Sequence, residues 1–204
     1  MRKPKPQKLK LYQRFSQAAY RTDLHRAQAD INDTGYLIDS ARSKKQHKVF
    51  VHPKNRDVVI AYRGTKLSDK RTRFKDIGSD IAILFGAQRY NKRFKNSQEH
   101  FDKVANHYKG YKLNTTGHSL GGSIAEHIKT NNEGRVYDSI TYSRGTGPAD
   151  LLKKKSNEVY DVSNRWDPIS MFARLGNKIT GKKQSVDKNF RAGENHSLAK
   201  LKAV

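Results

Sequence analysis

The chain has 204 residues, of which 34% are hydrophobic, and it contains no cysteine. This length suits one domain, and the lack of cysteine excludes a disulfide framework, a zinc–thiolate site and a thiol nucleophile. Lys and Arg number 42 against 19 Asp and Glu, so the formal net charge is +23 and favours a polyanionic partner.

The N-terminal residues predict a short tail followed by helices. Residues 1–8 are basic and contain two prolines, so we expect a disordered tail there and a single domain over residues 9–204. Apolar spacing predicts one or two helices over 9–31, and a turn over 30–35. No apolar run is long enough for a secretory signal or a transmembrane helix. We therefore expect an intracellular or virion-associated protein.

Two apolar runs around a polar turn predict a β-hairpin. The runs are residues 48–51 and 58–62, and the second run leads into Arg63-Gly-Thr65. Residues 73–86 then combine an apolar cluster with flanking basic side chains. This segment suits an amphipathic element at an interface and, equally, an ordinary core-facing helix. Helical spacing predicts a further helix over 91–108.

Residues 117–121 read Gly-His-Ser-Leu-Gly, the G-x-S-x-G pattern of a nucleophile elbow. A catalytic serine must stand clear of its backbone, and a sharp strand-to-helix turn achieves this. Such a turn leaves no room for a Cβ two residues before or after the serine. Residues 111–116 predict the strand, and 119–129 predict the helix. The simpler alternative is a Gly-rich turn without a catalytic role.

A nucleophile at Ser119 would need an acid and then a histidine further along the chain. Of the two histidines that follow, His127 lies two turns along the predicted helix and points away. His196 is therefore the candidate base, and its alternative is a solvated histidine near the C-terminus.

The candidate acid is Asp167, because it lies in the turn over residues 164–168 at the end of a predicted strand over residues 158–163. Ligand-facing groups gather at the carboxyl ends of strands in open α/β sheets. Asp161, inside the strand, is the second candidate. The alternative for Asp167 is a turn aspartate that bonds its own backbone. Residues 136–143 predict one more strand.

Four motifs in this order resemble the class 3 (fungal-type) lipases of the α/β-hydrolase superfamily. They read A-Y-R-G-T at 61–65, G-H-S-L-G-G at 117–122, V-S-N-R-W-D-P at 162–168 and N-H at 195–196. The resemblance covers about residues 48–200. It implies a compact α/β-hydrolase fold, with a mostly parallel central sheet and helices on both faces.

The resemblance also implies a serine lipid-ester hydrolase that cleaves glycerolipid acyl esters through an acyl-enzyme on Ser119. His196 would act as general base and then acid, and Asp167 would orient the imidazole. The backbone N–H groups of Thr65 and Leu120, with the Thr65 hydroxyl, would form the oxyanion hole. No cofactor is implied. The histidines show no metal-ligand spacing, so no metal is predicted.

The positive charge fits an anionic membrane, nucleic acid or an acidic protein. For a lipid-ester hydrolase an anionic membrane surface makes the most mechanistic sense, and it favours phospholipid slightly over acylglycerol. Non-specific nucleic-acid binding also fits the charge, although no base-reading module is visible. The simpler alternative is a Lys-rich surface. The rival function is a basic membrane- or nucleic-acid-binding protein, or a virion protein, on a lipase fold with little or no catalysis.

Overall fold

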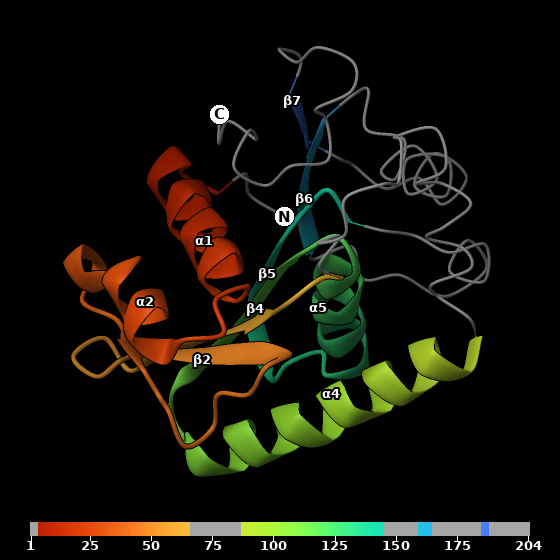
Figure 1. Cartoon of the computed structure of the whole chain (residues 1–204), viewed down its shortest axis with the longest axis horizontal. Coiled ribbons are helices and arrows are strands. Elements are labelled where there is room, and N and C mark those ends of the chain that lie inside the picture. The colour runs from red at the N-terminus through yellow and green to blue at the C-terminus, as the bar shows by residue number, and fades with distance from the viewer. Residues whose placement is uncertain (1–3, 66–86, 145–158, 165–184, 188–204) are drawn as a thin grey trace.

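The computed structural model describes residues 4–65, 87–144, 159–164 and 185–187. In these residues the centre of the fold is a seven-stranded sheet whose spatial order follows the chain (Figure 1). The strands are β1 Leu37–Ile38, β2 His47–His52, β3 Asp57–Tyr62, β4 Lys112–His118, β5 Val136–Tyr142, β6 Val159–Asn164 and β7 Ser185–Asp187. β1, β2 and β3 pair antiparallel, and β3 to β7 pair parallel.

The predicted hairpin is formed by β2 and β3. Val51 lies opposite Val58 and His47 opposite Tyr62, so the two apolar runs pair along their whole length. The turn between them closes with Arg56 at a φ of 50°, a conformation uncommon for a residue with a side chain. The hairpin prediction is confirmed.

Helices cover both faces of the sheet, as predicted. They are α1 Pro6–Ala18, α2 Leu24–Ala29, α4 Ala87–His107 and α5 Leu120–Asn131, with a 3₁₀ turn η1 at Asn32–Thr34. In β3, Val59 and Ala61 pack against α1, whereas Val58, Ile60 and Tyr62 pack against α4 and α5. Figure 1 shows the two helical layers on opposite sides. Because both faces of β3 are covered, its sequence is a continuous apolar run.

The N-terminal prediction is correct for the helices and wrong for part of the tail. α1 begins at Pro6, so residues 6–8 are helical, and the Lys8 ammonium pairs with Asp138 near the amino end of β5. A proline suits the first turn of a helix because no N–H partner is needed there. The two predicted helices over 9–31 are present, and Asp23 caps the second one. No helix in the described ranges is long and apolar enough to cross a membrane.

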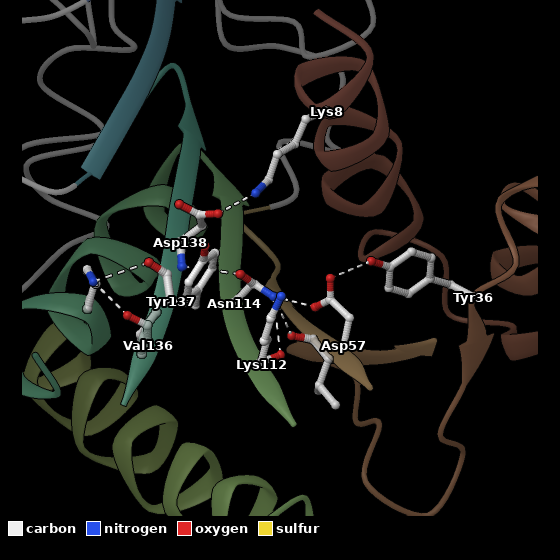
Figure 2. Close-up of polar contacts among 10 residues, drawn as sticks. Lys8, Tyr36, Asp57, Lys112, Asn114, Val136, Tyr137 and Asp138 are labelled. Atoms are coloured by element: carbon white, nitrogen blue, oxygen red, sulfur yellow. Dashed lines mark hydrogen bonds and ion pairs between the residues drawn. The ribbon is translucent and has the colours of Figure 1, made fainter. Parts of the chain in front are cut away.

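A polar network fastens the amino ends of the parallel strands to the N-terminal region (Figure 2). Asn114 of β4 is 1% exposed. Its amide donates to Asp57 of β3 and to the Val58 carbonyl at 3.2 Å, and its oxygen accepts from the Asp138 N–H at 3.2 Å. The Tyr36 hydroxyl donates to the other Asp57 oxygen at 3.0 Å. This network lies at the amino ends of the parallel strands, whereas Ser119 follows the carboxyl end of β4.

We expect Asn114→Ala to lower the free energy of unfolding by about 1–3 kcal/mol, because the Asp138 N–H and one Asp57 oxygen lose their buried partner. Urea denaturation measures the change. Asn106→Ala on the exposed side of α4 is the control and should change stability by less than about 0.5 kcal/mol. Equal losses in the two variants would show that the network adds no stability.

Candidate active site

Ser119 forms the sharp turn between β4 and α5. Its φ is 57° and its ψ is −127°, a strained combination for a residue that carries a side chain. The turn is held by its backbone: the Ser119 N–H donates to the Tyr142 carbonyl at 3.0 Å, and its carbonyl accepts from Gly122 at 2.9 Å. The predicted strand–turn–helix setting of this serine is therefore confirmed.

The glycines around Ser119 are required by close backbone contacts. A Cβ on Gly117 would lie 2.3 Å from the Gly121 carbonyl carbon, and a Cβ on Gly121 would lie 2.0 Å from the backbone carbonyl oxygen of Tyr62. Real Cβ atoms do not approach other atoms this closely, so neither position accepts a larger residue. The elbow therefore packs directly on the end of β3, as the G-x-S-x-G pattern predicts.

The loop after β3 lies beside the candidate nucleophile. A Cβ on Gly64 would lie 3.3 Å from the Cβ of Ser119 and 2.6 Å from the His118 oxygen. Thr65, which is half-buried, follows Gly64 directly, and Leu120 is the first residue of α5. Of the two predicted oxyanion residues, Leu120 therefore follows Ser119 directly, and Thr65 follows the glycine that lies against Ser119. Their role as hydrogen-bond donors stays a prediction.

The other predicted groups fall partly outside the part of the chain that the structure describes. Asp167, His196 and the amphipathic segment 73–86 lie outside the described residues. The second candidate acid, Asp161, lies within β6, is 4% exposed and accepts a hydrogen bond from Thr141 at 2.7 Å. His127 packs edge-on against Phe94, with ring centroids 4.9 Å apart.

Tyr20 is a neighbour of the elbow that the sequence did not indicate. Its hydroxyl lies 3.0 Å from Nδ1 of His118, the residue before the serine. Burial raises the pKa of Tyr20 to about 12, while the hydrogen bond from the Gly64 backbone opposes that rise. The hydroxyl is therefore protonated at neutral pH. It can accept from Gly64 and donate to His118, so Tyr20, two residues after α1, contacts both Gly64 and the residue before Ser119.

A buried ion pair joins α5, the helix that follows the elbow, to the residues after β5. The Arg144 guanidinium, 2% exposed, pairs with Glu126 of α5, whose side chain is 13% exposed. A Cβ on Gly122 would lie 3.4 Å from Arg144, so the first turn of α5 packs against this arginine just after β5. In the described part of the chain, no group of three or more His, Asp or Glu side chains could hold a metal ion.

Comparison with known proteins finds one family model that matches part of the chain. The model of the family described as "Lipase (class 3)" matches residues 59–131, a segment that runs from β3 to α5 and includes Ser119. No curated protein sequence matches the chain.

Solved fungal structures share the fold at low sequence identity. A mutant of MDLA from Penicillium cyclopium is 15% identical, with a TM-score of 0.58 over 91% of this chain and 81% of that chain. A lipase from Rhizopus microsporus var. chinensis is 15% identical, with a TM-score of 0.54 over 92% and 76%. Lip2 lipase from Yarrowia lipolytica is 17% identical, with a TM-score of 0.53 over 81% and 74%.

These matches show that the chain shares the α/β fold of solved fungal lipases. The class 3 lipase model matches a segment that holds the motifs at 61–65 and 117–122, and the expected resemblance is confirmed there; the motifs at 162–168 and 195–196 lie outside that segment.

Proposed function

We propose that the protein is a serine hydrolase of lipid esters, a lipase or a phospholipase, that cleaves acyl esters of glycerolipids. The observation that carries this proposal is the strained Ser119 between β4 and α5, enclosed by glycines and bordered by the loop that leads to Thr65. A structural turn does not need this strain, whereas a nucleophile that must be reached from two sides does.

The proposed reaction has two steps. The Ser119 oxygen attacks the ester carbonyl, while His196, oriented by Asp167, accepts the hydroxyl proton and passes it to the departing alcohol. The negative charge on the carbonyl oxygen is stabilised by the N–H groups of Thr65 and Leu120. Water, deprotonated by His196, then attacks the acyl carbonyl, and the imidazolium returns that proton to the Ser119 oxygen as the fatty acid leaves. No cofactor is needed.

The net charge of +23 supports an anionic membrane surface as the place of action, since a basic residue near such a surface contributes about 1 kcal/mol. The same charge favours the rival function, a basic protein that binds nucleic acid or lipid head groups on a lipase fold with little or no catalysis. The two functions differ in whether Ser119 is reactive.

Labelling with a fluorophosphonate probe tests this difference. We expect the wild type to be labelled and Ser119→Ala to lose the label, because the probe reacts with an activated serine only. Ser40→Ala, which changes an exposed serine far from the elbow in sequence, is the matched control and should keep full labelling. An unlabelled wild type, or equal labelling of Ser119→Ala, would support the rival function.

A further inference from the structure

Two arginines converge on the loop beside Ser119. Arg63 stands at the end of β3, directly before Gly64, and its guanidinium carbon lies 5.8 Å from the centre of the Tyr20 ring. Arg93 of α4 donates from Nη2 to the Arg63 carbonyl. The Arg63 guanidinium thus lies over the ring of Tyr20, and the Tyr20 hydroxyl contacts His118, the neighbour of Ser119. The two arginines are tied to the same loop as the candidate oxyanion hole.

The surroundings of these arginines are strongly cationic. Both side chains are half-buried, and Nε of Arg93 is buried with no hydrogen-bond partner in the described residues. Burial and the nearby Arg63 charge lower the pKa of Arg93. Lys48 of β2 is 1% exposed, and burial together with the Arg63 charge lowers the pKa of its ammonium as well. Arg63 therefore lies within electrostatic reach of two other cations, Arg93 and Lys48.

No carboxylate of the described ranges forms an ion pair with any of the three cations. The Lys48 ammonium donates a hydrogen bond to the Lys44 carbonyl oxygen at 2.8 Å. Partly buried charges of one sign repel each other and lose hydration, so an arrangement of this kind is costly unless an anion neutralises it. A bound anion would remove this cost, and guanidinium groups present forked N–H donors that match phosphate oxygens.

We infer that Arg63 and Arg93 form an anion subsite beside Ser119 that receives the phosphate of a glycerophospholipid while Ser119 attacks an acyl ester of the same molecule. The inference rests on the proposed function and names its substrate class. The phosphate of such a lipid is one glycerol skeleton away from its acyl esters, so one molecule can reach both groups. A neutral acylglycerol would leave both guanidinium groups without an anion.

Substrate selectivity tests the subsite. The substrates are dihexanoyl phosphatidylglycerol and dihexanoylglycerol, both kept monomeric, in about 0.5 M NaCl so that the long-range field of the protein is screened. We expect Arg63→Gln and Arg93→Gln to lower the ratio of kcat/KM for phospholipid over diacylglycerol by about 10- to 100-fold, the range of a charge-assisted hydrogen bond. Loss of folded protein cancels in this ratio, because both substrates are measured on one preparation.

Matched controls separate the subsite from general charge. Lys92→Gln and Lys95→Gln remove the same charge from exposed positions on α4, one residue before and two residues after Arg93. Their ratio should equal that of the wild type. An unchanged ratio in the arginine variants, or an equal fall in the lysine variants, overturns the inference while leaving the proposed hydrolase intact.

Two further measurements separate the sources of phosphate and the two proposals. If inorganic phosphate inhibits the wild type but not the arginine variants, and these variants keep the wild-type ratio, the site serves free phosphate and the substrate assignment is wrong. If no ester is hydrolysed, binding of dihexyl-ether glycerophosphate is compared with that of dihexyl-ether glycerol by calorimetry. Arginine-dependent preference for the phosphate ligand would support the subsite even though the proposed function had failed, and equal binding would overturn both.

Discussion

His196→Ala is expected to lower kcat for ester hydrolysis by roughly a million-fold, and Asp167→Asn by roughly ten-thousand-fold. Without the imidazole, nothing accepts the Ser119 proton or returns it to the leaving alcohol. Without the carboxylate, the imidazole is present but held in the wrong tautomer, so some activity is left. Steady-state hydrolysis of a soluble butyrate ester measures both effects, with circular dichroism to confirm folding.

The two other candidates in the sequence supply the controls. His127 packs on Phe94, and Asp161 accepts from Thr141 inside the sheet, so neither is free to serve Ser119 as the fold stands. His127→Ala should keep kcat within about three-fold of the wild type, as expected for a residue outside the reaction. A larger loss in Asp161→Asn than in Asp167→Asn would make Asp161 the acid. A His196→Ala variant with wild-type kcat would remove the proposed mechanism.

Combining the substitutions adds a second test of the triad. Because the three groups act as a unit, Ser119→Ala with His196→Ala should be no slower than the slower single variant. Losses that multiply would indicate that the two residues act independently, which the proposed mechanism does not allow.

The parts of this fold that the sequence predicts are those set by local rules. The hairpin follows from two apolar runs around a polar turn, and the elbow follows from Gly117 and Gly121, whose missing Cβ atoms are required by contacts within one supersecondary unit. The strand and the helix around Ser119 carry their own apolar spacing. Each of these features needs only a short window of sequence.

The parts that the sequence does not predict depend on contacts between distant segments. Tyr20 reaches His118 across 98 positions, and Arg93 reaches the Arg63 carbonyl across 30. Nothing in the spacing of either residue marks it as a neighbour of Ser119. The start of α1 was missed for a related reason, since the Lys8–Asp138 pair stabilises a turn that a basic, Pro-containing segment would not be expected to form alone.

The Arg144–Glu126 pair shows the same dependence on tertiary packing, and removing one partner should cost more stability than removing one partner of an exposed pair. We expect Glu126→Gln to lower the free energy of unfolding by about 3–5 kcal/mol, because it leaves a buried guanidinium without its counter-charge. Urea denaturation with a constant m-value measures the loss. The exposed pair Arg135–Asp102, 2.8 Å apart with side chains 45% and 42% exposed, is the matched control.

Asp102→Asn makes the same acid-to-amide change and should cost less than about 1 kcal/mol, since water screens an exposed pair. The double variant Glu126→Leu/Arg144→Met should recover most of the loss, because well-packed apolar side chains can replace a buried ion pair at little cost. Equal losses for Glu126→Gln and Asp102→Asn would mean that the Arg144 charge is neutralised by other groups. The elbow would then depend on its glycine contacts and its backbone hydrogen bonds, and the buried pair would be a consequence of how α5 packs beside Arg144.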